Sequence, residues 1–497
     1  MMQAVGALAP PQRILKELDL RRALLVVLVV CILAFGGLTL WFVSDQGGGS
    51  LEANAKLRAA EVMGAAAKTV ITARAGGVEG THGSAVELIN REIEVRRVAD
   101  NVHMAVGVGN VTMVTTSEGN VVFDSGLIIQ AAEQRKLLRE QVSDAPVTHL
   151  VLSHSHADHA SGAKVWMADG VEVVAHREFV EELRYLKELE PFQHARNRKF
   201  FPWMPETAPD LGFLDWGDVS PTITVDDGRD YEFELGGVRF EVLSTPGAEG
   251  ADNICLWLPG ERILLSGDFF GPQFPQFPNI VTLRGEKIRK PVEYIRSLEK
   301  IIALKPAMVV PSHFNPTVGE DAVMAALIRT RDAVKFVHDE TVAAMNRGDT
   351  VYDAMRAIAL PPELELPQNH GRVSWAVKSI WEYYASWFHW DTTTELYPVP
   401  ARDVYGDVVD LAGVSALVAR AREHQASGRP VEALHLIEMA LASGGGDDFA
   451  ALEVRRDALL NLKSAAEEGF RNDYELFWLD SRLKETEERI GTLSPMG

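Results

Sequence analysis

Four potential metal ligands stand within residues 154–159, which read HSHADH. His154 and His156 are two positions apart, so both imidazoles leave the same face of an extended segment and can meet one cation. Asp158 and His159 follow where the chain turns, and they can point at a second cation. Imidazole and carboxylate groups together suit zinc or a similar divalent ion. The spacing therefore favours a two-metal centre over a polar loop with surface histidines.

A two-metal centre of this composition has hydrolytic chemistry. A pair of divalent cations polarises an ester oxygen and converts bound water to a hydroxide nucleophile near neutral pH. A catalytic site keeps an open position for this water, whereas a structural site is closed by its protein ligands. We therefore expect the chain to be a metal-dependent hydrolase.

Apolar strands must position these ligands. Residues 147–153 (VTHLVLS) are rich in leucine and β-branched side chains, which is typical of a buried strand. The strand delivers the HSHADH residues to a loop at its carboxyl end. Two further apolar runs, residues 263–267 and 308–312, end in the same way at Asp268 and His313. Alternation of such strands with helical segments indicates an α/β fold.

The HSHADH motif resembles the signature of the metallo-β-lactamase fold superfamily, which implies an αββα sandwich. The superfamily usually continues with a TPGHT loop whose histidine is a metal ligand, but residues 245–249 read TPGAE here. The alkylsulfatase branch, which hydrolyses long-chain alkyl sulfate esters, is similar in having a glutamate at this place. The resemblance implies two Zn2+ ions, one bound by His154, His156 and Glu249, the other by Asp158, His159 and His313, with Asp268 shared.

A segment after Asp268 resembles the part of alkylsulfatases that engages the sulfate group. In residues 279–285 (NIVTLRG), Asn279 and Arg284 stand five positions apart. The planar fork of arginine suits a tetrahedral oxyanion, and the asparagine can donate to a second oxygen. Asp124 resembles a buried aspartate that supports the ligand loop in this superfamily, although a turn-forming aspartate is the alternative.

The C-terminal part resembles the alkylsulfatase dimerisation domain, which implies a homodimer. Residues 360–364 (LPPEL) and 383–388 (YYASWF) resemble its start, and helical segments follow Asp410. The chain departs from the branch at residues 371–375 (GRVSW), where a pocket histidine is common, and at Asp268, where glutamate is usual. Trp375 could reshape the ester site. We expect no sterol-carrier-like third domain.

The N-terminal part contains an uncharged apolar segment, residues 23–44, long enough to cross a membrane as a helix. Cationic residues between positions 13 and 22 precede it, so the positive-inside rule predicts a cytoplasmic N-terminus. The catalytic domain would then be periplasmic or extracellular. A cleaved signal peptide is the alternative, but its apolar region is usually about 7–15 residues long.

The composition excludes several classes of function and indicates more than one domain. The 497 residues are 46% apolar, which is enough for more than one core. A formal net charge of −21 excludes nucleic-acid binding, which requires clustered cations. Two cysteines without a CxxC pair provide neither a disulfide framework nor a thiolate zinc site. We predict a cytoplasmic segment (1–22), a transmembrane anchor (23–44), a linker (45–85), a catalytic domain (86–345) and a helical dimerisation domain (346–490).

These observations lead to one functional prediction with two alternatives. We expect a dinuclear zinc hydrolase of the alkylsulfatase type, in which a metal-bound hydroxide cleaves sulfate esters of long-chain alcohols. The resemblance implies catalytic roles for Asp158, Asp268 and Arg284. One alternative is another hydrolase on the same fold, acting on a lactone, phosphodiester or thioester. The other is a catalytically silent membrane-anchored scaffold, against which the complete ligand set argues.

Overall fold

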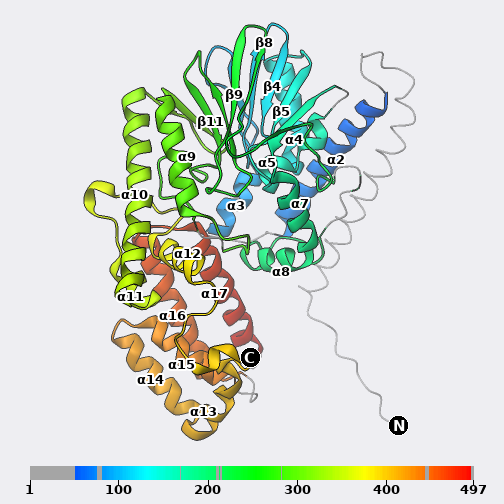
Figure 1. Cartoon of the computed structure of the whole chain (residues 1–497). Coiled ribbons are helices and arrows are strands. Elements are labelled where there is room, and N and C mark those ends of the chain that lie inside the picture. The colour runs from blue at the N-terminus through cyan, green and yellow to red at the C-terminus, as the bar shows by residue number, and fades with distance from the viewer. Residues whose placement is uncertain are drawn as a thin grey trace, which may run out of the picture.

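The computed structural model describes residues 51–74, 81–167, 170–208, 212, 215–280, 283–442 and 447–493. These residues form an α/β domain followed by a helical domain (Figure 1). The predicted cytoplasmic segment and transmembrane anchor, residues 1–44, lie outside the described residues. Among the helices that are described, none is both long and apolar enough to span a bilayer.

The first sheet of the α/β domain contains seven strands in their order along the chain. Its first four strands are antiparallel, and the last three continue in parallel from the fourth. The strands are β1 (Val95–Arg97), β2 (Val102–Ala105), β3 (Val111–Thr116), β4 (Gly119–Phe123), β5 (Val147–Val151), β6 (Glu172–His176) and β7 (Ile223–Val225).

The second sheet contains six strands in the order β13-β12-β11-β10-β9-β8. Only the β11–β12 pair is parallel among the described strands of this sheet. The strands are β8 (Tyr231–Leu235), β9 (Val238–Ser244), β10 (Ile254–Leu258), β11 (Ile263–Gly267), β12 (Met308–Pro311) and β13 (Thr317–Val318).

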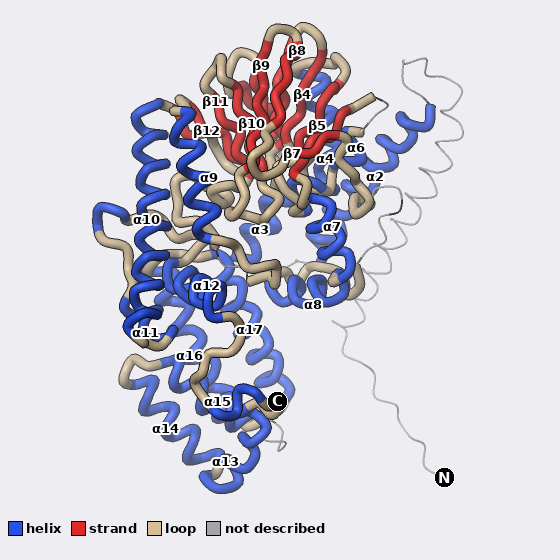
Figure 2. The backbone as a smooth tube through the Cα atoms, viewed as in Figure 1, coloured by secondary structure: helices blue, strands red, loops and turns tan. Residues whose placement is uncertain are grey.

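The two sheets pack face to face, and helices cover both outer faces (Figure 2). Phe123 and Val151 of the first sheet share one buried cluster with Leu256 and Leu265 of the second. The helices α4 (Ile128–Gln141), α9 (Pro291–Leu304) and α10 (Glu320–Arg347) contribute to two further clusters, one on each outer face. The predicted αββα sandwich is therefore confirmed.

Part of the predicted linker, residues 45–85, is packed against this sandwich. Helix α2 (Leu51–Arg74) lies along α4, with Ala60 buried in the cluster on that face. The Lys68 Nζ atom lies 2.7 Å from Glu133 Oε2 on α4. The alanine-rich sequence of α2 lets the two helices approach closely, so α2 belongs to the outer layer of the domain and not to a linker.

Short helices connect the strands, and a run of longer helices forms the C-terminal domain at one end of the sandwich (Figure 1). Ala421, Ala433, Ile437 and Ala451 form part of the helical core, which confirms the predicted helical domain. The shorter helices of the α/β domain are α3 (Thr81–Asn90), which precedes β1, and α5 (Ala157–Ala160), α6 (Ala163–Trp166), α7 (Phe179–Glu188) and α8 (Glu190–Phe200), which lie between strands. The later helices are α11 (Val351–Ala357), α12 (Val373–Ala385), α13 (Tyr405–Ala412), α14 (Val414–Ala426), α15 (Pro430–Ala442), α16 (Phe449–Glu468) and α17 (Asp473–Leu493).

Candidate metal centre

The predicted ligands meet at the carboxyl ends of strands from both sheets. The HSHADH residues follow β5, Glu249 follows β9, Asp268 follows β11 and His313 follows β12. The parallel pairing of β11 with β12 brings the ends of those two strands together. Three groups of side chains have ligand atoms within 4.8 Å of one another: His154, His156 and Glu249; His154, His159 and Asp268; and Asp158, His159 and His313.

The first group joins two imidazoles and a carboxylate. His154 Nε2 lies 2.8 Å from His156 Nδ1, which in turn lies 3.6 Å from Glu249 Oε2. Nδ1 of His156 therefore faces the other two ligand atoms, and its Nε2 faces away from them. The structure thus brings together the three residues expected at one metal, including the glutamate that stands where the wider superfamily has histidine.

The second group surrounds the carboxylate of Asp268. Its Oδ2 atom lies 3.4 Å from His159 Nε2 and 3.2 Å from His313 Nε2. Asp158 Oδ2 lies 3.5 Å and 3.3 Å from the same two nitrogens. Asp268 also belongs to a group with His154, so it lies between the two sets of ligands as a bridging carboxylate must.

Two buried polar atoms in this centre indicate that the residues fit divalent cations. His159 Nε2 and Asp268 Oδ1 make no hydrogen bond to any described residue, although both side chains are buried. Buried polar atoms in folded proteins normally have a partner, so an orphaned nitrogen beside an orphaned oxygen requires an explanation. A divalent cation held by these imidazole and carboxylate groups would supply the missing partner for both atoms.

The carboxylates of the cluster attract positive charge, which protonated imidazoles supply. Burial opposes protonation, but Asp268 and Asp158 raise the pKa of His159 well above its ordinary value and that of His313 to about 10. Burial lowers the pKa of His154 well below its ordinary value, with further lowering from its neighbouring histidines. A metal ion that binds here displaces the protons from the imidazoles.

Asp124 contacts the proposed ligand His159 and two serines that each precede a ligand. These contacts fit the supporting role that was one of the two alternatives predicted for Asp124. Its Oδ2 atom lies 3.0 Å from His159 Nδ1 and accepts hydrogen bonds from the Ser153 and Ser312 hydroxyls at 3.0 and 2.5 Å. Its Oδ1 atom accepts the Ser153 N–H at 2.8 Å. A carboxylate at Nδ1 fixes the ring so that Nε2 faces the metal position.

Arg284 and Asn279 lie beside the ligands. Arg284 Nη2 is 3.4 Å from His156 Nε2, and the guanidinium carbon is 5.9 Å from the centre of the Tyr474 ring. Asn279 Nδ2 is 3.4 Å from His370 Nε2. The sequence therefore identified two of the polar residues here but missed His370 and Tyr474.

Two charged residues near the ligands were also missed. Glu286 Oε1 lies 3.3 Å from His156 Nε2, and Arg289 Nη1 donates to Glu249 Oε1 at 2.9 Å. Both follow Arg284 closely in the sequence, so the charge pattern R-x-E-x-x-R was a visible signal. Tyr474 offered no such signal, because its helix has the apolar spacing of ordinary packing.

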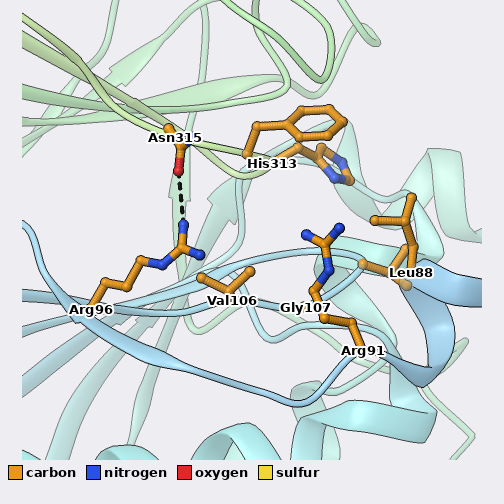
Figure 3. A pocket seen from close by; sticks show the side chains of 9 residues that line it. Leu88, Arg91, Arg96, Val106, Gly107, His313 and Asn315 are labelled. Carbon is orange, nitrogen blue, oxygen red and sulfur yellow. Dashed lines mark hydrogen bonds between the residues drawn. The ribbon is translucent and has the colours of Figure 1, made fainter.

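A pocket of about 150 Å³ opens beside His313 (Figure 3). Arg91 points its guanidinium toward the His313 imidazole, and Arg96 donates to Asn315 Oδ1 at 2.8 Å. Arg91 makes no ion pair or hydrogen bond with other residues in the part of the chain that the structure describes. The pocket therefore links a predicted metal ligand with an available cationic side chain; its lining residues are Leu88, Arg91, Arg96, Val106, Gly107, Val108, His313, Phe314 and Asn315.

Trp375 is half-buried on α12. The guanidinium carbon of Arg372 lies 5.6 Å from the centre of its ring, and Arg372 pairs with Glu475 at the start of α17. These contacts hold the tryptophan at the junction of two helices of the C-terminal domain. Its effect on the ester site stays a prediction.

Two family models match the chain. Residues 104–313 match the Metallo-beta-lactamase superfamily, and residues 350–477 match the family described as alkyl sulfatase dimerisation. The first match covers all seven predicted metal ligands together with Asn279 and Arg284. The second match covers His370, Trp375 and Tyr474, so the residues around the centre come from both matched regions.

Several curated proteins are similar to the chain over most of its length. A linear primary-alkylsulfatase from Pseudomonas sp. (strain ATCC 19151) is 31% identical over 325 residues, which is 61% of this chain and 60% of that protein. The alkyl/aryl-sulfatase BDS1 from Saccharomyces cerevisiae is 24% identical over 407 residues, 76% of this chain and 62% of that protein. The chain thus spans about three fifths of the length of these relatives.

A solved structure has the same fold. The stereoselective inverting sec-alkylsulfatase Pisa1 from Pseudomonas sp. superposes with a TM-score of 0.68 at 19% identity, covering 86% of this chain and 71% of that one. A double mutant of the same enzyme gives a TM-score of 0.69 at 21% identity, covering 82% and 69% of the two chains. The likeness extends beyond the sandwich into the helical domain.

Proposed function

We propose that this chain, which combines a metallo-β-lactamase domain with an alkyl sulfatase dimerisation domain, hydrolyses sulfate esters with the help of two zinc ions. The observation that carries the proposal is the convergence of seven imidazole and carboxylate side chains, with Glu249 among them. When bound, a pair of divalent cations acidifies a water molecule and polarises the ester.

The ligands divide between the two ions as their distances suggest. His154, His156 and Glu249 would hold one ion, and Asp158, His159 and His313 the other, with Asp268 contributing to both. Asp124 orients His159, which keeps one nitrogen of that ring aimed at its ion. Each ion would then have three ligands of its own and a share of Asp268, so water or substrate would take a fifth coordination position.

Arg284 and Asn279 would bind the sulfate group. The Arg284 guanidinium lies next to His156, and 23% of its side chain is exposed, so its N–H groups are within reach of a ligand at the first metal. Charge-assisted hydrogen bonds from an arginine strengthen as negative charge develops on the sulfate oxygens. Asn279 supplies a neutral donor from the same segment.

We propose that the pocket beside His313 admits the ester. Leu88, Val106 and Phe314 give it an apolar wall for the carbon chain of a long-chain alcohol. Arg91 gives it a positive charge, and a protein with a net charge of −21 needs such a local attraction to capture an anion.

We further propose a homodimer that is held at a membrane. Large apolar side chains are exposed in the first part of the helical domain, including Trp390 (85%) and Leu411 (90%). These side chains are concentrated between residues 383 and 411, and such a concentration of exposed apolar groups is typical of a protein interface. The proposal of an anchor, with a cytoplasmic N-terminus and an outward catalytic domain, rests on the apolar residues 23–44 and the cations before them.

A substrate panel tests the reaction class. The full-length zinc-loaded protein, in a non-ionic detergent, is given an alkyl sulfate, an alkyl phosphodiester, a lactone and a thioester at equal concentrations. The proposal predicts that only the sulfate ester is hydrolysed efficiently. Preferential hydrolysis of any other substrate would contradict the sulfate-ester assignment but not the proposed metal centre.

A further inference from the structure

Glu286 lies at the centre of a charged network beside the first metal position. Its Oε1 atom lies 2.8 Å from Arg284 Nε and 3.3 Å from His156 Nε2. Its Oε2 atom accepts a hydrogen bond from Arg289 Nη2 at 2.9 Å. The side chain is only 16% exposed, so these contacts replace most of its hydration. One carboxylate therefore contacts a proposed metal ligand and the proposed sulfate-binding arginine.

The two nitrogens of His156 have different surroundings. Nδ1 faces His154 Nε2 and Glu249 Oε2, so it is the nitrogen available to a cation. Nε2 must then carry the ring proton, because a neutral imidazole has one donor and one acceptor. Arg284 Nη2, at 3.4 Å, has only protons to donate and cannot accept this one. Among the described contacts of Nε2, the Glu286 carboxylate is the acceptor.

Arg289 ties Glu286 to a second proposed ligand. Its Nη1 atom donates to Glu249 Oε1 at 2.9 Å and to the Asn279 carbonyl at 2.5 Å, while its Nη2 atom donates to Glu286. The Arg289 side chain is 2% exposed, so water does not compete for these bonds. With Glu249 Oε1 held by Arg289, Oε2 is the oxygen directed at His156 and the cation position.

Arg284 is oriented by the same carboxylate. Its Nε–H is engaged by Glu286, which leaves the two terminal nitrogens, one of them beside His156, as the donors for a substrate oxyanion. The planar guanidinium turns as a unit, so fixing Nε also fixes the direction of the terminal edge.

We propose that Glu286 is a positioning residue that holds His156 in the tautomer with Nδ1 toward the first metal and aims Arg284 at the sulfate. This inference rests on the dinuclear centre proposed above. It assigns to Glu286 no contact with the reacting atoms; its effect is exerted through His156 and Arg284.

Metal binding tests the inference without reference to any substrate. Full-length Glu286→Ala, Glu286→Gln and a control variant, Glu293→Ala, are stripped of metal and titrated with zinc against a chromophoric chelator. Glu293 is a matched control because it pairs with exposed Lys290 in the same part of the chain. Loss of an outer carboxylate on a ligating histidine typically weakens metal affinity about 10- to 100-fold.

Glu286→Ala should therefore lower the affinity for one of the two zinc ions by about 10- to 100-fold and leave the affinity for the other unchanged. Glu286→Gln should restore most of that affinity, because its amide oxygen can still accept the His156 proton. When cobalt replaces zinc in Glu286→Ala, the absorption of one bound cobalt ion should change and that of the other should not. If Glu286→Ala does not fold, Glu286→Asp, which keeps the charge but shortens the reach to His156, should show the selective loss.

Equal weakening of both ions, or affinities equal to those of Glu293→Ala, would overturn the inference. The first result would indicate a general loss of structure, and the second would show that His156 needs no outer carboxylate. Neither result depends on which ester is hydrolysed, so a failed substrate assignment leaves this test intact. Failure of the wild-type protein to bind two metals would instead contradict the proposed centre itself.

Discussion

Arg284 Nη2 lies 3.4 Å from His156 Nε2, although the two residues are 128 positions apart in the chain. His156 is a proposed metal ligand, and Arg284 is the proposed partner of the sulfate group. Their proximity would bring the ester bond and the anionic group of one substrate into the same small volume. Only His156 of the two is a proposed metal ligand, so a measurement of metal content separates loss of the centre from loss of sulfate binding.

Arg284→Ala should lower kcat/KM for an alkyl sulfate by about 100- to 1,000-fold, the usual effect of removing one donor to a developing oxyanion. Zinc content should stay at two equivalents, because Arg284 donates no metal ligand. Arg284→Lys should recover little, since an ammonium cannot reproduce the planar fork. Steady-state kinetics with metal analysis check both points. A kcat/KM equal to that of the wild type in the alanine variant would show that Arg284 does not bind the sulfate group.

Arg91→Ala should raise KM for an alkyl sulfate and leave kcat nearly unchanged, because Arg91 lies in the pocket and not among the ligands. The effect should shrink at high salt, where attraction between the guanidinium and an anion is screened. Arg97→Ala is the matched control, since that arginine is exposed nearby and pairs with Asp100. An equal change in both variants would show that only net charge matters.

His370 should make the protein sensitive to mild acid. Burial, with help from the Arg284 charge, lowers the pKa of His370 to about 3. Between that value and the unfolded pKa of about 6.5, the unfolded chain binds a proton that the folded chain does not, so stability falls as pH falls. Relative to His370→Gln, the wild type should lose up to about 1.4 kcal/mol per pH unit below pH 6. Urea unfolding of both proteins at several pH values measures this, and parallel stability curves would contradict it.

Leu411→Asp should weaken the proposed homodimer. The leucine is 90% exposed in the isolated chain, and an aspartate in its place would have to bury a charge if the surface is an interface. Sedimentation velocity at several concentrations should show monomers at concentrations where the wild type is dimeric. Val318→Asp, at an exposed position on β13, should change nothing. If the Leu411→Asp protein is still dimeric, the interface does not include Leu411.

The convergence of the seven proposed ligands could be expected from the sequence because each of them ends an apolar strand or belongs to a short motif. β5, β11 and β12 are recognisable by composition. The pairing of β11 with β12 brings Asp268 and His313 together, and the packing of the two sheets adds His154, which follows β5 in the other sheet. The sandwich follows from the same strands, since each needs helices to cover its outer face.

The residues that surround the ligands were harder to predict. His370 and Tyr474 reach Asn279 and Arg284 only because α17 folds back onto the segment before α12, where Asn472 Nδ2 donates to the His370 carbonyl at 3.0 Å. Contacts between segments so distant in the chain leave no local pattern. Helix α2 was expected within a linker for a related reason: its weak periodicity does not show that Ala60 is buried against α4.

Sulfate release from dodecyl sulfate during zinc titration of the metal-free full-length protein tests the central claim most directly. The account predicts no release from the metal-free sample, full activity at two equivalents of zinc, and its loss when a chelator is added. Asp158→Ala, which removes one ligand of the second ion, should stay inactive throughout the titration. Sulfate release in the chelated sample, or undiminished release by Asp158→Ala, would contradict a dinuclear metal-dependent sulfatase.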